Sequence, residues 1–495
     1  MNRQSLAMTA LLCASFMDVM DTMITNVALP SIQADLGASP VELEWTIAGY
    51  LIAFATTLLL GGRLGDRFDR RTLFALSLLG FVLASLGATL AWSGASLVGF
   101  RIGQGAMAGL MIPQVLAYVQ VLYAPEKRAP LYAAIGSMSV LGTVVGQLLG
   151  GWLVTVDAFG MGWRSIFLIN VPIGLIALVV AFVCLPRAVS ALRERLDVAG
   201  AVLSGGAIFL FVFALTTGHL NRWTWWIWAL MAVAVALFVA FVGLERRLTR
   251  SGSAPLVSTE LFRVRSFSAS ALVQVLFAFG SGSYAMVLGF YLQQVVGLSP
   301  LAFGLVLLPI SLGAMAGSAI AVPLSKRHGV GLVVTGGLLQ AAAFLWVRFV
   351  LDTESPLNSW VLVPPMALAG VGLIFVAMPL VEIALREVSP DLAGTASGVL
   401  NTVQQTGSAL GIAAAGGLYF ALEESSGAVV AELGALWVPV VCFGLTAVAA
   451  LVALGLHGKR LHRERRDVLR TPGDVLPNER GDEAVAYLEG MREFR

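Results

Sequence analysis

Residues 7–29, AMTALLCASFMDVMDTMITNVAL, decide the fold class of this chain. The run is apolar for most of its length and contains only two charged side chains, Asp18 and Asp21. It is long enough to cross the hydrocarbon core of a bilayer, which takes about 20 residues in a helix. The sequence therefore predicts a membrane-spanning helix with two carboxylates at membrane depth.

Similar apolar runs follow along the whole chain. They lie at 43–61, 72–92, 96–121, 131–154, 165–185, 198–217, 223–244, 267–291, 301–323, 330–350, 360–384, 394–420 and 435–456. Apolar residues make up 58% of the 495 residues and charged residues only 12%, which excludes an ordinary soluble enzyme. We expect an all-α integral membrane protein with fourteen transmembrane helices, and no enzymatic activity.

The charged side chains predict the orientation of these helices. If residue 1 lies inside, nearly all Lys and Arg fall on inner segments, whereas the outer loops hold Arg164, Arg222 and several carboxylates. Those carboxylates are Asp35, Glu42, Glu44, Glu423, Glu424 and Glu432. By the positive-inside rule, the chain has an even number of spans in the inner (cytoplasmic) membrane, with both termini in the cytoplasm.

Internal similarity suggests two related halves. The fifth run carries Gly142, Gly146 and Gly150, and the thirteenth carries Gly407, Gly411 and Ala415 at the same spacing. Transporters often consist of two homologous bundles around a central site. We expect four parts: an N-terminal six-helix bundle (1–185), two inserted helices with their flanking loops (186–266), a C-terminal six-helix bundle (267–456) and a cytoplasmic tail (457–495).

The first run carries a polar stripe. At 100° per residue its polar side chains share one arc of about 140°; they are Asp18, Asp21, Thr22, Thr25 and Asn26. Ionisable groups at membrane depth are costly and usually face a cavity. Two neighbouring carboxylates cannot both ionise cheaply there, so we expect at least one to gain and lose a proton near neutral pH. The alternative is a static hydrogen-bonded pair between helices.

Arg101 in the fourth run is the candidate partner of these acids. Asp21 lies about 21 Å from the inner side and Arg101 about 22 Å, so the two side chains could meet. A nearby guanidinium would favour the ionised carboxylate, and its withdrawal would favour protonation. We therefore predict proton coupling by Asp21, Asp18 and Arg101. The alternative is that Arg101 reaches the outer interface or only braces the bundle.

The family resemblance described below implies a substrate cavity beside these residues. Its predicted lining consists of polar residues near the acids and of large apolar residues in the second half: Thr25, Asn26, Gln104, Met111, Phe277, Tyr284, Phe375 and Met378. Aromatic and Met side chains suit lipophilic, possibly cationic, compounds. For each aromatic residue taken singly, ordinary helix packing is the competing interpretation.

The loop at 62–71, GRLGDRFDRR, is dense in charges of both signs. We expect a cytoplasmic gate of salt bridges that involves Gly62, Asp66, Arg67, Arg70 and Arg71. The alternative is a simple positive-inside anchor. The four His show no metal-ligand spacing, and no phosphate-binding loop is present. We therefore expect no metal, no cofactor and no nucleic-acid partner, with the proton gradient as the energy source.

Several of these stretches resemble motifs of the major facilitator superfamily, and in particular of its fourteen-span drug:proton antiporters. The resemblance lies in GRLGDRFDRR (62–71), DTMITNVALP (21–30), RIGQG (101–105), GTVVGQLLGG (142–151), WRSIFLINVPIG (163–174) and GTASG (394–398). The chain departs from the family at Asp69, where glycine is usual, and at Gln147, where proline is usual. The resemblance marks Gly142, Gly146, Gly150 and Gly151 as the antiporter motif of the fifth span.

This resemblance implies alternating access, in which two six-helix bundles rock about a central cavity. The leading hypothesis is a proton-coupled exporter of lipophilic drugs or antibiotics, monomeric in the lipid bilayer. One alternative is a dedicated exporter of one endogenous metabolite, siderophore or lipid. The other is a membrane sensor or scaffold that does not transport and whose tail binds a partner.

Overall fold

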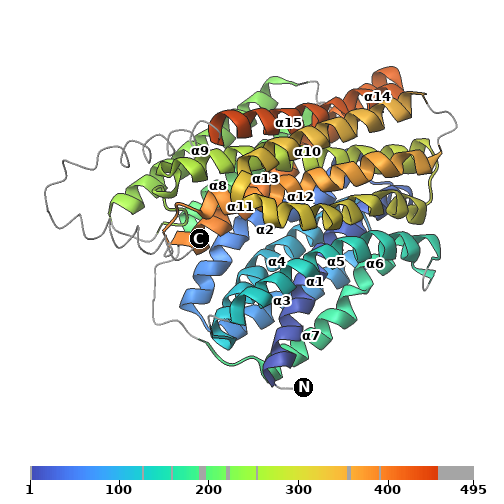
Figure 1. Cartoon of the computed structure of the whole chain (residues 1–495). Coiled ribbons are helices and arrows are strands. Elements are labelled where there is room, and N and C mark those ends of the chain that lie inside the picture. The colour runs from blue at the N-terminus through green and yellow to red at the C-terminus, as the bar shows by residue number, and fades with distance from the viewer. Residues whose placement is uncertain are drawn as a thin grey trace, which may run out of the picture.

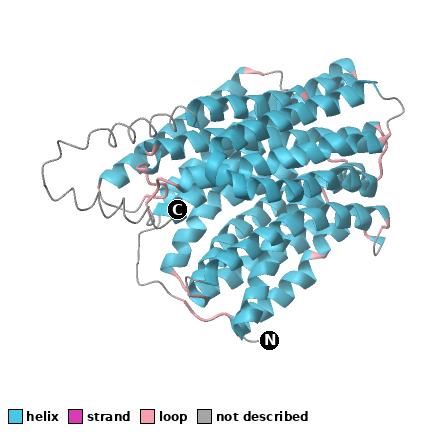
Figure 2. Ribbon diagram, in the orientation of Figure 1, coloured by secondary structure: helices cyan, strands magenta, loops and turns pink. Residues whose placement is uncertain are grey.

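The computed structural model describes residues 3–124, 127–157, 160–188, 197–218, 223–251, 255–353, 358–389 and 392–454. Within these ranges the side chains of Asp66, Ala129, Ala133, Lys326, Arg327, Ala393, Glu424 and Ser426 are not described. The described part of the chain is almost entirely helical and contains no strand (Figure 2). The predicted tail at 457–495 lies outside the described residues.

The N-terminal bundle consists of six spans. These are α1 (Arg3–Leu36), α2 (Pro40–Arg67), α3 (Arg70–Thr89), α4 (Gly94–Leu122), α5 (Arg128–Thr155) and a divided sixth span, α6 (Ser165–Leu168) and α7 (Asn170–Cys184). The start of α2 shows how the sequence sets these boundaries. Ser39 Oγ accepts a hydrogen bond from the Glu42 N–H, and the Ser39 N–H donates to Glu42 Oε2, which together form a capping box.

The C-terminal bundle is built from the last third of the chain. It contains α10 (Arg265–Phe290) with the π-helix Tyr291–Val295, α11 (Pro300–Thr353), α12 (Val363–Leu385), α13 (Ala393–Ser426), α14 (Ala428–Ala435) and α15 (Trp437–Ala449) with the π-helix Ala450–Leu454. Two further helices, α8 (Val198–Gly218) and α9 (Trp225–Arg250), separate the bundles in sequence. In space, α8 packs against both α2 and α13 and so joins the inserted pair to the two bundles.

The predicted all-α membrane fold is confirmed. Among the described residues, thirteen helices are long and apolar enough to cross a membrane. The fourteenth long helix, α13, carries polar residues in its middle, such as Asn401 and Gln405. It packs against α2, α8 and α10, so less of its surface has to be apolar.

One predicted boundary was wrong. The first span does not end at Leu29, because α1 continues through Pro30 to Leu36. A proline removes one donor from the helix, and neighbouring helices in a membrane protein make that loss tolerable. The predicted division into a tenth and an eleventh span is confirmed, because α11 consists of the spans Pro300–Ser325 and His328–Thr353, with a kink at His328, whose backbone is not helical (φ −131°, ψ 32°).

The two bundles contact each other at the end of the molecule that carries the α1–α2 connection. There Gln294 Nε2 donates to Gln33 Oε1 (2.5 Å), and the Leu301 N–H donates to Thr155 Oγ1 (3.2 Å). In Figure 1 the lower helices of the N-terminal bundle diverge from the C-terminal bundle toward the end that carries the N terminus, whereas α2 and α13 stay in contact, with Thr402 Oγ1 donating to the Ala55 carbonyl oxygen (3.3 Å).

Candidate functional site

A buried ion pair lies in the middle of the N-terminal bundle. Arg101 Nη1 of α4 donates to Asp21 Oδ2 of α1, and both side chains are 0% exposed. The predicted meeting of Asp21 and Arg101 is therefore confirmed. Two amides complete the site, since Gln104 Nε2 (2.8 Å) and Asn170 Nδ2 (2.6 Å) both donate to Asp21 Oδ1. The carboxylate thus holds together α1, α4 and α7.

Arg101 is fixed from several sides. Its Nε donates to the Thr46 carbonyl oxygen (3.0 Å), and its Nη1 also donates to Gln104 Oε1 (2.6 Å). Its guanidinium lies 4.2 Å from the centre of the Tyr50 ring, a favourable cation–π arrangement. The arginine does not reach the outer interface in this structure. Its Nη2 has no hydrogen-bond partner among the described residues, so the bonding of this buried cation is incomplete.

Asp18 uses a different donor from Asp21. The Tyr50 hydroxyl donates to Asp18 Oδ1 at 2.5 Å, and the Asp18 side chain is partly buried. Because the same Tyr50 ring lies against the Arg101 guanidinium, this tyrosine contacts both Asp18 and the cation that pairs with Asp21. The two acids are therefore linked through Tyr50 and Arg101, with the fully buried acid paired to a cation and the partly buried acid bonded to a neutral hydroxyl.

The glycines of α5 pack against the segment of α1 that carries these acids. A methyl group at Gly142 would lie 2.9 Å from the Phe16 carbonyl oxygen, and one at Gly146 would lie 2.8 Å from the Met20 carbonyl oxygen. At Gly150 it would lie 2.6 Å from a side-chain carbon of Ile24. Three glycines one turn apart therefore let α5 approach the backbone of α1 closely, as in other membrane helix pairs.

The other face of α5 contacts the C-terminal bundle. A methyl group at Gly151 would lie 2.6 Å from the Leu301 Cα, and one at Gly304 of α11 would lie 2.5 Å from the Gln147 carbonyl oxygen. The helix is continuous at Gln147, where proline is usual in the family. Hence α5 is packed between the acid-bearing helix of one bundle and α11 of the other.

Three of the residues predicted to line a substrate cavity are fully buried in this structure. Thr25, Gln104 and Met111 are each 0% exposed. The Gln104 amide instead donates a hydrogen bond to the Asp21 carboxylate, and Thr25 Oγ1 donates to the Asp21 carbonyl oxygen (2.7 Å). Asn26 is partly exposed and donates to the Thr22 carbonyl oxygen of its own helix (3.1 Å).

The large residues predicted for the cavity take part in helix packing. The Phe277 ring lies 6.1 Å from that of Phe443, and the Tyr284 ring lies 4.6 Å from that of Phe344. Phe375 is buried in a small cluster against which Met378 packs. Their part in binding a substrate stays a prediction.

The loop at 62–71 is held by Asp69 at the start of α3. Asp69 Oδ2 accepts hydrogen bonds from the Thr72 N–H (3.2 Å) and hydroxyl (2.8 Å), and Oδ1 accepts from the Ala188 N–H (3.0 Å). Partial burial by itself would raise the pKa of Asp69. Hydrogen bonds from Thr72 and from the N–H groups of Ala188 and Arg71 outweigh burial and hold this pKa below its usual value. The departure from glycine at this position therefore provides a helix N-cap.

The arginines of the loop make separate contacts. Arg71 donates to the Phe182 carbonyl oxygen and lies over the Phe182 ring, and Arg67 lies over the Phe68 ring. Arg70 lies near Gly65, where a methyl group would be 3.1 Å from its Nη1, and a methyl group at Gly62 would have no neighbour within 4 Å. The Asp66 side chain lies outside the described residues. The gating role of the loop stays a prediction.

Sequence reasoning missed three members of the buried network. Ser85 Oγ accepts from Gln104 Nε2 (2.7 Å), and Asn170 and Tyr50 bond the two acids. Asn170 had a detectable signal, because it is an amide inside an apolar stretch whose neighbours match a family motif. Ser85 and Tyr50 had none, since serine and tyrosine are common in packed membrane helices.

Two carboxylates expected in acidic outer loops are buried instead. Glu44 in α2 and Glu432 in α14 are each 0% exposed, and neither has a hydrogen-bond partner among the described residues. Glu44 lies at the contact between the bundles, where a methyl group at Gly416 of α13 would be 2.5 Å from its Oε1. The prediction was wrong because both acids lie in helices that pack against α13, and composition alone does not report this packing.

These features define a class of protein: a multi-pass membrane protein of two helical bundles, with a carboxylate–arginine pair buried halfway along one of them. The model of the Major Facilitator Superfamily matches residues 11–197 and 189–412. The chain belongs to this superfamily.

Relatives of similar length support this membership. The chain is 35% identical to the probable actinorhodin transporter of Streptomyces coelicolor, over 99% of this chain and 84% of the relative. It is 35% identical to the tetracenomycin C resistance and export protein of Streptomyces glaucescens, over 81% and 73%. It is 34% identical to a puromycin resistance protein of Streptomyces alboniger, over 82% and 80%.

Solved structures share the fold at low identity. A peptide transporter POT in complex with sulfate superposes with a TM-score of 0.65 and 16% identity, covering 93% of this chain and 98% of that chain. A bacterial homologue of the human lysosomal transporter Spinster gives a TM-score of 0.63 and 16% identity, covering 92% and 97%. These similarities concern the fold alone.

Proposed function

We propose that this chain is a proton-coupled exporter of lipophilic, antibiotic-like compounds, which works by alternating access in the cytoplasmic membrane with both termini inside. The observation that carries the proposal is the Asp21 carboxylate, which is fully buried and bonded to Arg101, Gln104 and Asn170. A carboxylate at this depth is expensive unless it is paired, and such groups mark proton and substrate pathways.

The pair provides a switch. Removing the charge of one partner of a buried ion pair leaves the other uncompensated, which costs several kcal/mol. When Asp21 takes up a proton, Arg101 loses its counter-charge and must find water or another partner. The arrangement with Arg101 in place therefore favours ionised Asp21, and an arrangement with Arg101 withdrawn favours the proton.

Packing supplies a route from this switch to the bundle interface. The α1 segment around Asp21 lies against Gly142, Gly146 and Gly150 of α5, and α5 in turn lies against α11 of the other bundle. A movement of α1 that separates Asp21 from Arg101 has to be accommodated along this packed series. Proton binding and the opening of the bundles are coupled in this way.

The substrate class rests on the relatives. Those compared above are named for actinorhodin transport, for tetracenomycin C resistance and export, and for puromycin resistance. Charged residues are rare in the spanning helices of this chain, which suits substrates that partition into apolar surroundings.

Efflux from cells tests this function. Cells that express the protein are loaded with a fluorescent lipophilic compound, and efflux is followed with and without a protonophore. We expect rapid efflux that stops when the gradient collapses and that is absent in Asp21→Asn. Glu382→Gln is a matched control, because Glu382 is an exposed carboxylate on α12. Efflux that survives the protonophore would contradict proton coupling.

A dedicated exporter of one metabolite is the second candidate. It is favoured by the names of several relatives, each of which refers to a single compound or compound class, such as cephamycin or methylenomycin A. Competition between chemically unrelated compounds in the same efflux assay separates the two. Inhibition by one structural series only would favour the dedicated role.

A further inference from the structure

A cavity lies beside the C-terminal end of the inserted helix α9, away from the buried ion pair. Its volume is about 670 Å³, and it is lined by the last turns of α9 and by residues between 257 and 263, which precede α10. Apolar side chains of α9, including Phe238 and Phe241, line one part of it, and Arg246, Arg250 and Arg263 line the other. The cavity therefore combines an apolar wall with a cationic rim.

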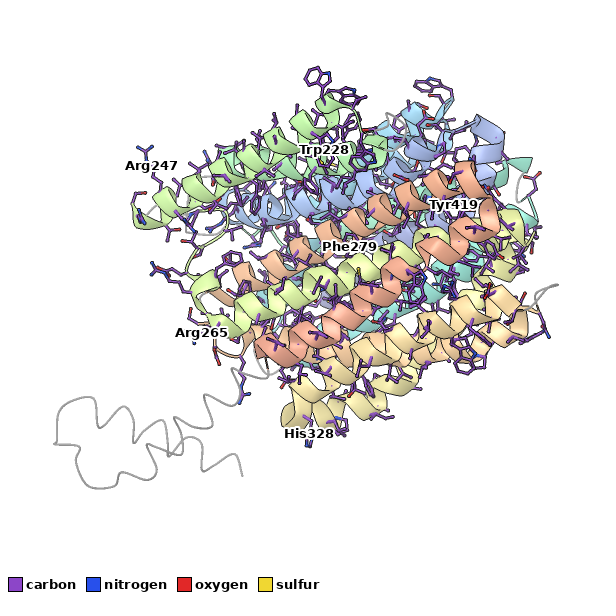
Figure 3. The ribbon with its side chains drawn as sticks, turned by 90° about the horizontal axis from the view of Figure 1, so that it is seen from above. Trp228, Arg247, Arg265, Phe279, His328 and Tyr419 are labelled. Carbon is purple, nitrogen blue, oxygen red and sulfur yellow. The ribbon has the colours of Figure 1, made fainter. Side chains whose placement is uncertain are left out.

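The arginines around this cavity lack partners within the described part of the chain. Arg246, Arg247, Arg250 and Arg263 are exposed, and none of their guanidinium groups forms a hydrogen bond or salt bridge with another described residue. Arg247 lines an adjoining depression together with Arg246 and Arg250. Figure 3 shows Arg247 at the end of α9 and Arg265 at the start of α10 at the same end of the molecule.

The carboxylates nearby do not neutralise this group. Glu245 is 1% exposed and faces the protein, where its Oε2 accepts a hydrogen bond from the Val257 N–H (3.1 Å). Glu260 is exposed at the cavity and, among the residues that the structure describes, is the only other acid that lines it. The exposed charge around the cavity is therefore strongly positive, which repels cations and attracts a phosphate group.

An apolar groove continues from the cavity toward the middle of the membrane. It has a volume of about 340 Å³ and lies between α8, α9 and α13, where Val235, Phe238 and Leu410 line it. Phe238 lines both hollows, so they adjoin each other along α9. Phe238 and Val235 are about half exposed on the outside of the bundle, so the groove faces the lipid.

We propose that the cavity and the groove together bind one anionic phospholipid, which belongs to the inner leaflet in the orientation proposed above. Its phosphate lies among Arg246, Arg250 and Arg263, and one acyl chain follows the groove past Phe238. The match is one of charge and of shape, because the cationic rim and the apolar groove follow each other along α9 in the same order as headgroup and chain. Basic pockets between helices at the cytoplasmic face of a membrane are suited to acidic headgroups.

The bound lipid joins the inserted pair to the C-terminal bundle. The groove is walled by α8 and α9 on one side and by α13 on the other, so a chain within it packs against both. This binding does not depend on transport, and it can be measured on protein that is inactive as an exporter.

Native mass spectrometry of the full-length protein in detergent tests the proposal. Phosphatidylglycerol and phosphatidylcholine with identical chains are added in equal amounts, and retention of each lipid is measured. We expect selective retention of phosphatidylglycerol, weakened at least about tenfold in R246A/R250A, since a charge-assisted hydrogen bond is worth about a factor of ten or more. The matched control is R187A/R386A, which removes two other exposed arginines at the same end of the molecule.

Two further arms separate a lipid site from a simple anion site. Val235→Trp fills the apolar groove and leaves the arginines in place, and we expect it to weaken phosphatidylglycerol retention. Glycerol phosphate should compete only at far higher concentration than the lipid. Equal retention of both lipids, unchanged retention in R246A/R250A, or equal competition by glycerol phosphate would each overturn the proposal.

Discussion

Gly146 of α5 lies against the backbone of Met20 in α1, the residue before the buried acid Asp21. A methyl group at Gly146 would be 2.8 Å from the Met20 carbonyl oxygen, closer than real side-chain carbons approach. We therefore expect Gly146→Ala to push α1 and α5 apart and to reduce efflux by about tenfold or more, with a loss of stability of about 1–3 kcal/mol from overpacking.

The same helix provides the control for this substitution. A methyl group at Gly136 has no neighbour within 4 Å, so Gly136→Ala should leave efflux and melting temperature unchanged or slightly raised. The pair is compared by efflux rate and by thermal unfolding in detergent. Equal behaviour of the two variants would show that close packing of α5 on α1 is not required.

Truncation of Arg101 should destabilise the protein strongly. Arg101→Ala removes the cation from a fully buried pair, and removing one partner of such a pair costs about 3–5 kcal/mol. Arg101→Lys keeps the charge but loses the bonds to Thr46 and Gln104, so partial efflux is expected. Thermal unfolding of the purified variants checks this prediction. The melting temperature should be lowest for Arg101→Ala, intermediate for Arg101→Lys and highest for the unmodified protein. An Arg101→Ala variant as stable as the unmodified protein would argue against the pair.

Replacement of Glu44 should raise the stability of the protein, whereas truncation of Arg101 should lower it. The Glu44 carboxylate is fully buried between α2 and α13 without a hydrogen-bond partner among the described residues. Replacing an unsatisfied buried polar group by an apolar one of similar size removes its desolvation cost. We expect Glu44→Leu to stabilise the protein by about 1–3 kcal/mol. A lower melting temperature than that of the unmodified protein would mean that Glu44 has a partner in the working molecule.

Through Asp69 in the loop at 62–71, the stability of the fold should depend on pH in the acid range. The pKa of Asp69 is lower in the folded protein than in the unfolded chain, so its hydrogen bonds stabilise the fold above the unfolded value, near 4. This contribution is lost as the pH falls below 4 and through the folded value. Asp69→Ala should cost about 1 kcal/mol at neutral pH through loss of the N-cap, and it should reduce the loss of stability between pH 5 and 3. The free energy of unfolding is measured against pH for Asp69→Ala and for the unmodified protein. An equal loss of stability in both proteins between pH 5 and 3 would contradict the assignment.

The membrane fold was predictable from the sequence because soluble proteins rarely contain apolar runs of membrane length. The meeting of Asp21 and Arg101 was predictable too, because depth along a helix follows from counting residues. The fully buried state of Gln104 was not predictable in the same way. Helical periodicity places Gln104 on the face of Arg101, but it does not say whether that face meets a cavity or another helix.

The errors at the helix ends have a common physical origin. The ends of helices were read from apolar composition, whereas capping by Ser39 and continuation through Pro30 set the real ends. Glu44 is a separate case, because it lies within the apolar run at 43–61 and was grouped with the outer loops for its charge, although it lies one turn inside α2. The tertiary partners Asn170 and Tyr50 come from distant parts of the chain, and no local pattern reports such contacts.

The central claim is that Asp21 takes up and releases a proton during export, and it leads us to expect that substrate binding displaces this proton. Purified protein in weakly buffered detergent solution is titrated with a transported compound, and the pH change is followed with an indicator dye. We predict proton release by the unmodified protein and by Glu382→Gln, and none by Asp21→Asn that still binds the compound. Undiminished proton release from Asp21→Asn would contradict the account.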